Sequence, residues 1–279
     1  MGIRGRHRGR ILIDRKKLII ICAAIVIVAA AAITWIVLAG SAKKAETPFA
    51  NVSNISWESM ETQNEARHID SNGVTSVFGI DVSSHQGTID WQKVKEQGVK
   101  FVMIRLGFCD FKTGELNLDK SFKTNVEGAT KAGIDVGVYF FSQALNDWEA
   151  KNEAEFVLAN LKDLKITYPV TYDLEDYTAS DEARAADITA EQATKNCVVF
   201  CDTVKAAGYT PMIYTNTHWA QTMFDLESLS KYPIWYASYK AKPELDISMA
   251  MWQYTNEGTL DGIESEHVDM NMLFVKDEN

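Results

Sequence analysis

Two carboxylates lie two residues apart at the end of an apolar run, a spacing that suits acid–base chemistry. The run Pro169–Leu174 is predicted to be a buried strand, and it carries Asp173 with Glu175 directly beyond it. Side chains two apart on a strand point to the same face. Like charges held that close raise the pKa of one carboxyl, as general acid catalysis near neutral pH requires. A solvated acidic turn is the alternative interpretation.

Two further acids lie on other apolar runs. Asp81 lies near the end of Val77–Val82, where a single Asp could also cap a turn. The segment Val268–Met272 alternates apolar and polar residues, which places Asp269 and Asn271 on one face of a strand. A sheet that closes its first strand against its last would bring Asp269 close to Asp81. The acids expected to meet at one mouth are Asp81, Asp173, Glu175 and Asp269.

Other common chemistries lack support in the motifs. The sequence contains no GxSxG elbow, no P-loop and no HExxH segment, and its five histidines form no i,i+3 or i,i+4 pair. His85 and His267 could still join Asp81 and Asp269 around a metal, which is an alternative to a purely carboxylate site. We expect no metal and no cofactor.

Strands and helices must position these acids, and their pattern begins at Val77. Apolar runs alternate there with amphipathic stretches. The predicted strands are Val77–Val82, Phe101–Gly107, Val136–Phe141, Pro169–Leu174, Pro211–Thr215, Ile234–Ser238, Ala250–Tyr254 and Val268–Met272. The predicted helices are Asp90–Gln97, Leu118–Ala132, Asp147–Leu164 and Thr189–Ala207. These elements predict a distorted α/β barrel of about eight strands with helices mainly in the first five units, and functional side chains at the C-terminal ends of parallel strands. An open doubly wound sheet is the alternative.

The N-terminal part of the chain has a different character. The 279 residues carry a formal charge of −10, but residues 1–17 hold seven Lys and Arg against one acid, which leaves +6 on this tail and −16 on the remainder. Residues 18–39 are uncharged and long enough to cross a bilayer as a helix. The positive-inside rule then places residues 1–17 in the cytoplasm and the later residues outside the cell membrane. A cleaved signal peptide is the alternative, and it would make the protein secreted.

Residues 40–76 are polar and lack sustained periodicity, so they are predicted to be an extracytoplasmic stalk with a short helical piece near Trp57–Glu65. The folded domain would then be residues 77–279. Its acidity excludes duplex nucleic acid as a partner, because phosphate binding needs a basic face. Cys109, Cys197 and Cys201 are an odd number for a disulfide framework and are expected to be buried free thiols.

Six motifs in order along residues 77–275 resemble glycoside hydrolase family 25, the lysozymes that cut peptidoglycan as N-acetylmuramidases. They are Phe78–Gly87 (FGIDVSSHQG) followed by Ile89-Asp90-Trp91, Val136–Phe141 (VGVYFF), Tyr172–Glu175 (YDLE), Tyr214–Asn216 (YTN), Trp252–Tyr254 (WQY) and Val268–Asn271 (VDMN). The resemblance implies a distorted α/β barrel. It also implies hydrolysis of the β-1,4 bond between N-acetylmuramic acid and N-acetylglucosamine, with Glu175 as the general acid.

The remaining roles follow from the resemblance. Asp173 would orient or stabilise the 2-acetamido group of the muramic sugar as that group attacks C1, and Asp81 and Asp269 would position Glu175 and water. The residues expected to line the saccharide groove are Tyr139, Tyr214, Trp235, Trp252, Gln253 and Asn271. The expected partners are peptidoglycan glycan strands and the membrane through residues 18–39, with a wall-remodelling complex as a further candidate. The alternatives are a metal-dependent peptidoglycan deacetylase and a non-catalytic glycan-binding scaffold.

Overall fold

The apolar runs of the sequence form the strands of one barrel. A computed structural model describes residues 49–63, 65–175 and 183–276, and the predicted tail (1–17), span (18–39) and residues 40–48 lie outside these ranges. Within the described ranges, no helix has both the length and the apolar character needed to cross a bilayer.

The strands of the barrel in the described residues are β4 (Val74–Val82), β5 (Phe101–Cys109), β7 (Asp135–Phe141), β8 (Val170–Asp173), β9 (Pro211–Asn216), β10 (Ile234–Ala237), β11 (Met251–Gly258) and β12 (Val268–Lys276). They pair in this order, and β4 pairs with both β5 and β12, which closes the barrel. The eight predicted strands are therefore confirmed, and the open doubly wound sheet is wrong.

The last strand runs against the others. The strands from β4 round to β11 are parallel, whereas β12 is antiparallel to both β11 and β4. The parallel arrangement expected of the strands therefore does not extend to β12. The connection between β11 and β12, residues 259–267, is shorter than the dozen or so residues that a parallel crossover needs. The start of β12 consequently lies at the same mouth as the C-terminal ends of the parallel strands.

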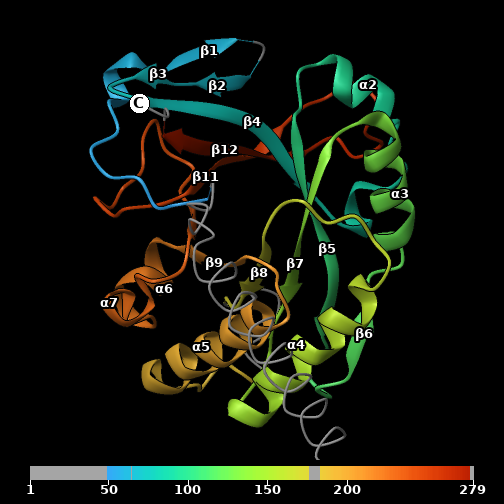
Figure 1. Cartoon of the computed structure of the whole chain (residues 1–279), viewed down its shortest axis with the longest axis vertical. Coiled ribbons are helices and arrows are strands. Elements are labelled where there is room, and N and C mark those ends of the chain that lie inside the picture. Colours follow the sequence, from blue (N-terminus) through green and yellow to red (C-terminus); the bar gives the residue numbers. More distant parts are fainter. Residues whose placement is uncertain (1–48, 64, 176–182, 277–279) are drawn as a thin grey trace, which may run out of the picture. The chain divides into compact units, whose positions relative to one another are not determined.

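Helices cover the outside of the first half of the barrel, as the sequence predicted. They are α2 (Trp91–Glu96), α3 (Phe122–Ala132), α4 (Asp147–Leu161) and α5 (Ala190–Ala206), with the short helices α6 (Thr217–Thr222) and α7 (Leu226–Leu229) after β9. Figure 1 shows α2 to α5 on the outer side of the strands. In the described residues, no α-helix follows β10 or β11.

The helix predicted from Leu118 begins later, at Phe122. Before it, β6 (Leu116–Leu118) pairs antiparallel with the end of β5. Asp119 fixes the bend between the two elements, because its backbone N–H donates to the Leu106 carbonyl and its buried carboxylate accepts from the Ser121 N–H. The amphipathic pattern did not reveal this hairpin.

Residues 49–63 and 65–76 are folded onto the barrel and are not a stalk. They contain the 3-10 turn η1 (Trp57–Ser59) and the short strands β1 (Glu61–Gln63), β2 (Ala66–His68) and β3 (Asp70–Ser71), and β3 pairs with β4. Figure 1 shows these strands beside β4 and β12. The boundary predicted at residue 77 is therefore wrong, since the described residues belong to one compact unit.

A few large side chains explain why this polar segment folds. Trp57 packs edge-on against Trp252 and Phe274, with ring centroids 5.3 and 5.9 Å apart. The Arg67 guanidinium lies over the rings of Trp252 and Tyr254, at 5.1 and 4.8 Å from their centroids. These contacts depend on side chains that lie far apart in the sequence, so local periodicity does not predict them.

Apolar side chains fill the inside of the barrel. Phe49, Phe101, Met103, Met212, Trp235, Met251 and Leu273 form this interior cluster with their neighbours. Phe49 and Phe101 both contact Tyr168, with centroids 5.0 and 4.9 Å apart. The barrel is a packed core, and its chemistry is confined to the mouth.

Candidate active site

The four predicted acids meet at one mouth of the barrel. Asp173 is the last residue of β8, Glu175 follows two residues later, and Asp81 lies near the end of β4. Asp269 is the second residue of β12 and pairs directly with Asp81 in the β4–β12 register. The antiparallel direction of β12 brings Asp269 to this mouth.

Asp81 is held by two amides inside the barrel. Its Oδ2 accepts hydrogen bonds from Gln253 Nε2 and Asn271 Nδ2, both at 2.8 Å. Burial raises the pKa of Asp81 well above its ordinary value and the charge of Asp269 adds to that rise, while the two amide hydrogen bonds oppose it. Asp81 therefore favours its protonated form more than a solvated aspartate does.

Asp173 is buried, at 5% exposure, and its Oδ1 has no hydrogen-bond partner among the described residues. Burial raises the pKa of Asp173 well above its ordinary value, the charges of Glu175 and Asp81 raise it further, and the nearby Arg105 lowers it. A buried acceptor without a donor is costly in a folded protein. This oxygen is consequently available to a donor that a ligand brings.

Glu175 and Asp269 are the more accessible members of the group. Asn216 Nδ2 donates to Glu175 Oε2 at 3.4 Å, while Asn216 Oδ1 caps α6 by accepting from the Trp219 N–H at 3.0 Å. The cap fixes which way the amide faces. Burial, together with the charge of Glu175, raises the pKa of Asp269 to about 6.

A cavity of about 610 Å³ opens beside Glu175. It extends over the ends of β5 and β6, and its lining residues are Ser84, His85, Arg105, Phe108, Cys109, Asp110, Phe111, Asn117, Leu118, Lys120, Phe141 and Glu175. Arg105 is fixed there by a 2.8 Å ion pair with the buried Asp119. Aromatic rings, a fixed cation and a carboxylate at one edge suit a polar, ring-shaped ligand such as a sugar.

Five of the six predicted groove residues lie at or beneath the mouth, in two groups. Tyr139, Tyr214 and Trp235 pack against one another inside the barrel beneath the mouth. Gln253 and Asn271 are buried and hold Asp81, with Tyr214 Oη donating to Gln253 Oε1 at 3.0 Å and Trp235 Nε1 donating to Asn271 Oδ1 at 2.8 Å.

Trp252 does not reach the mouth. Its side chain lies outside the barrel, where Nε1 donates to the Ser238 carbonyl at 2.9 Å and the ring packs on Trp57. Adjacent residues on a strand point to opposite faces, so Gln253 at the next position faces the interior while Trp252 cannot. The prediction that Trp252 lines the groove therefore has no geometric support.

The prediction missed two residues at the mouth. Tyr239 is 47% exposed and donates to Gln253 Oε1 at 2.8 Å, so it presents an aromatic ring to solvent next to the acids. Arg105 is a charged residue within the apolar run of β5, and that interruption was a detectable signal. Tyr239 lies beyond the end of β10, where the strand pattern stops, and it gave no signal.

The metal alternative has no assembled ligand set. Among residues 49–63, 65–175 and 183–276, no three His, Cys, Asp or Glu side chains are grouped so that they could hold a metal ion. His85 and His267 therefore do not join Asp81 and Asp269 in such a group. Cys109, Cys197 and Cys201 are buried free thiols, as predicted.

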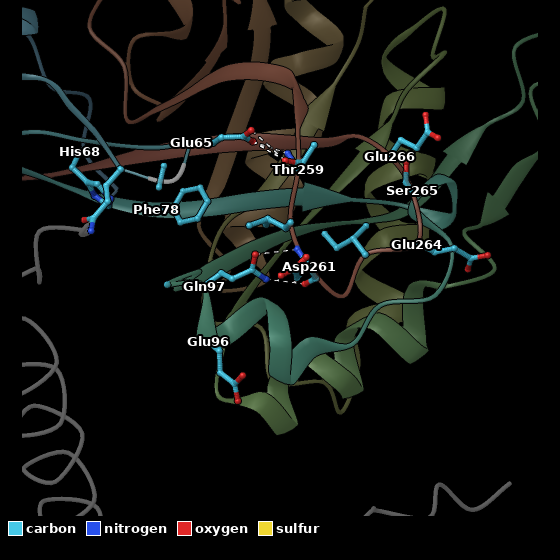
Figure 2. A pocket seen from close by; sticks show the side chains of 15 residues that line it. Glu65, His68, Phe78, Glu96, Gln97, Thr259, Asp261, Glu264, Ser265 and Glu266 are labelled. Atoms are coloured by element: carbon cyan, nitrogen blue, oxygen red, sulfur yellow. Dashed lines mark hydrogen bonds between the residues drawn. The ribbon is translucent and has the colours of Figure 1, made fainter.

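A larger cavity, of about 970 Å³, lies away from the four acids (Figure 2). It is lined by the β1–β2 hairpin, the end of α2 and the β11–β12 connection. The Gln97 side chain exchanges two hydrogen bonds with the backbone of Asp261, and Glu65 accepts from the Thr259 N–H at 2.8 Å. These polar groups join neighbouring segments to one another, so the smaller cavity beside Glu175 is the better candidate for chemistry.

Comparison with known proteins agrees with the family resemblance seen in the sequence motifs. A sequence model described as Glycosyl hydrolases family 25 matches residues 80–263, which include Asp81, Asp173 and Glu175. The autolytic lysozyme of Clostridium acetobutylicum is 28% identical over 186 residues, which cover 66% of this chain and 52% of that protein. The chain thus spans about half the length of this relative.

Solved structures share the barrel. The modular autolysin LytC of Streptococcus pneumoniae, in complex with a synthetic peptidoglycan ligand, matches with a TM-score of 0.64 and 25% identity over 78% of this chain and 52% of that one. A family 25 glycosyl hydrolase of Bacillus anthracis matches with a TM-score of 0.61 and 26% identity, over 76% of this chain and 94% of that one.

Proposed function

Because the chain belongs to the glycosyl hydrolases of family 25, we propose that it is a lysozyme that hydrolyses the β-1,4 bond between N-acetylmuramic acid and N-acetylglucosamine in peptidoglycan. The observation that carries the proposal is the Oδ1 of Asp173, which has no hydrogen-bond partner in residues 49–63, 65–175 and 183–276, together with the half-buried Glu175 two residues later. This pair offers a proton donor that lines the cavity, Glu175, and a buried acceptor at the end of β8, Asp173. Such a division of roles suits a substrate that supplies its own nucleophile.

The first step of the proposed reaction breaks the glycosidic bond. Glu175 gives its proton to the glycosidic oxygen, and the bond between that oxygen and C1 breaks. The carbonyl oxygen of the muramic 2-acetamido group bonds to C1 with its own electron pair, while Asp173 Oδ1 accepts the hydrogen bond of the acetamido N–H. The leaving sugar departs with the proton as an alcohol.

The second step consumes water. Glu175, now ionised, takes a proton from a water molecule whose oxygen bonds to C1, and the acetamido oxygen leaves C1. The products are two shortened glycans, and Glu175 regains its proton. Asp81 and Asp269 lie beside this centre, and their raised pKa values limit the negative charge that accumulates around Glu175.

The side chains that would hold the sugar come from two sides of the mouth. The ring of Tyr239 is exposed on the side of Gln253, and Phe108, Arg105 and His85 line the cavity on the other side. Tyr139, Tyr214 and Trp235 would act from beneath by keeping the interior rigid. A glycan strand would then cross the mouth with its scissile bond above Glu175.

The test identifies the reaction products and measures the contribution of Glu175 to the rate. Purified peptidoglycan incubated with the protein should yield muropeptides with N-acetylmuramic acid at the new reducing ends, identified by mass spectrometry. Glu175→Gln should lower kcat by about 100- to 10,000-fold, because it removes a general acid. The matched control, Glu266→Gln on the exposed β11–β12 connection, should retain wild-type activity. New reducing ends of N-acetylglucosamine, or free amines without chain cleavage, would exclude the proposed reaction.

We further propose that residues 18–39 anchor the enzyme in the cell membrane, with residues 1–17 in the cytoplasm and the barrel outside. The uncharged run and the seven preceding Lys and Arg support this orientation. In cells that make the full chain, the protein should stay in the membrane fraction after alkaline extraction, and external protease should digest the barrel. A soluble mature protein that begins near Ser41 or Lys43 would contradict the anchor.

A further inference from the structure

One buried carboxyl has no part in the proposed mechanism. Glu153 on α4 is 1% exposed and lies on the helix face that also buries Ala150, Ala154 and Val157. Burying a carboxyl among apolar side chains costs free energy unless hydrogen bonds compensate for the lost water. The contacts of Glu153 therefore indicate what the residue does.

Glu153 binds the two residues that follow one strand of the barrel. Its Oε2 is 2.6 Å from Ser142 Oγ, and its Oε1 accepts from the Gln143 N–H at 3.1 Å, so it binds both residues that follow β7. The Cys109 thiol at the end of β5 lies near enough to Glu153 for the carboxyl's charge to raise the pKa of the thiol. Cys109 lines the cavity beside Glu175, so the carboxyl lies directly behind the cavity wall.

Ser142 connects this carboxyl to the strand that carries the catalytic pair. The Ser142 N–H donates to the Asp173 carbonyl at 2.7 Å, and Ser142 Oγ is 3.0 Å from the hydroxyl of Tyr172. Ser142, Tyr172 and Glu153 are all buried. Contacts of 2.6 to 3.0 Å through Ser142 therefore link Glu153 to the end of β8.

We propose that Glu153 is a positioning residue that holds Ser142 against the end of β8 and so fixes Asp173 relative to the sugar. This role rests on the proposed lysozyme activity. Glu153 acts through Ser142 and does not touch the substrate. A catalytic group needs its position fixed to within a fraction of an ångström, and a displacement of about 1 Å lowers the rate by about 100-fold.

The charges around Glu153 are consistent with a carboxyl that works in its neutral form. Burial raises the pKa of Glu153 to about 7 and the charge of Glu149 adds to it, while hydrogen bonds from Ser142 and Gln143 oppose the rise. Arg184 is the nearby cation, but its guanidinium is directed to Glu149 Oε2 at 3.0 Å and Cys109 Sγ at 3.8 Å. A neutral carboxyl can donate to Ser142 Oγ, whose own proton then reaches the Tyr172 hydroxyl.

Glutamine is uncharged and has the shape of a neutral glutamate, so Glu153→Gln tests whether the neutral form is sufficient. In Glu153→Gln the amide oxygen accepts from the Gln143 N–H and the amide nitrogen donates to Ser142 Oγ. Glu153→Leu keeps the volume but removes both contacts. Ser142→Ala breaks the link from the other side, and Val157→Ala, on the same buried helix face, weakens packing without touching Ser142.

The experiment measures kcat and KM on peptidoglycan fragments at a temperature at which every variant is folded. Glu153→Leu and Ser142→Ala should lower kcat by about 10- to 100-fold and leave KM within about twofold, because substrate binding is kept while Asp173 is displaced. Glu153→Gln should recover kcat to within about threefold, and Val157→Ala should keep it unchanged.

Each outcome decides the question. Wild-type kcat in Ser142→Ala refutes the role of Glu153 even if Glu153→Leu does not fold, and so does an equal loss of kcat in Val157→Ala. A Glu153→Gln variant as slow as Glu153→Leu also refutes it. If the wild-type protein releases no reducing ends, the proposed function itself fails and the positioning role falls with it.

Discussion

Replacing Glu153 by glutamine should change how the stability of the protein depends on pH. The Glu153 carboxyl is buried in the folded protein, where its pKa is about 7, whereas a solvated glutamate has a pKa of 4.5. Between these values the unfolded chain loses the proton and the folded protein keeps it. Because the unfolded chain then binds fewer protons, the free energy of unfolding falls as pH rises through this window.

The size of the effect follows from the shift. One pKa unit corresponds to about 1.4 kcal/mol, so a rise from 4.5 to about 7 removes about 3 kcal/mol of stability between pH 4.5 and 7. Glutamine has no proton to lose and keeps both hydrogen bonds. Relative to the wild type, Glu153→Gln should therefore be of similar stability near pH 4.5 and more stable by about 3 kcal/mol above pH 7.

Urea unfolding followed by tryptophan fluorescence at several pH values from 4.5 to 8 measures this difference. Taking the difference between variant and wild type cancels the contributions of Asp81 and Asp173, whose raised pKa values act in the same direction. Glu155→Gln is the matched control, because Glu155 is an exposed carboxylate on the same helix, paired with Lys151. If the stability difference between Glu153→Gln and the wild type is the same at every pH, the argument from burial is wrong.

Three further changes test other parts of the structure. Trp57→Ala should lower the free energy of unfolding, measured with urea, by about 2 to 4 kcal/mol, because Trp57 packs on Trp252. It should leave kcat unchanged, because Trp252 does not reach the mouth. An unchanged free energy of unfolding would mean that the segment before β4 is a stalk that does not stabilise the barrel. Gly79→Ala should lower the free energy of unfolding by about 1 to 3 kcal/mol, seen as a lower midpoint of thermal unfolding, because a Cβ there would lie 2.3 Å from the buried Phe101 ring. An unchanged midpoint would contradict this close approach. Tyr239→Ala should raise KM about tenfold and keep kcat within about threefold of the wild type, because the exposed ring contributes to binding the glycan. An unchanged KM would show that Tyr239 does not contact the glycan.

The sequence predicted the strands well because burial on both faces leaves a signal in consecutive residues. The runs that became β5 and β7 are apolar almost throughout, and their ends were predicted to within two residues. The β6 hairpin was not predicted, because three residues carry too little periodicity. The bend after it depends on the contact of Asp119 with Leu106. The packing of the segment before β4 was not predicted either, because Trp57 and Arg67 contact rings that lie almost 200 residues later in the chain.

The active site divides in the same way. The spacing of Asp173 and Glu175 predicted two carboxylates close together, since side chains two apart on a strand share a face, although β8 ends at Asp173 and Glu175 lies just beyond it. Position along the chain also indicated Asp81 and Asp269, although Asp269 reaches the mouth only because β12 runs antiparallel. Residue type alone could not show that Gln253 and Asn271 hold Asp81, or that Trp252 faces outward.

By itself, the sequence determined the strands, the acids at their ends and the resemblance to a family, because periodicity and motif spacing are local properties. Closure of the sheet into a barrel was decided by the pairing of β4 with both β5 and β12. Tertiary structure decided which acids are buried, which polar groups support them and which oxygen is left for a ligand. It also decided that a glutamate on α4 binds behind the catalytic strand. These properties arise from contacts between residues distant in the chain, and they set the pKa values and positions on which the proposed chemistry depends.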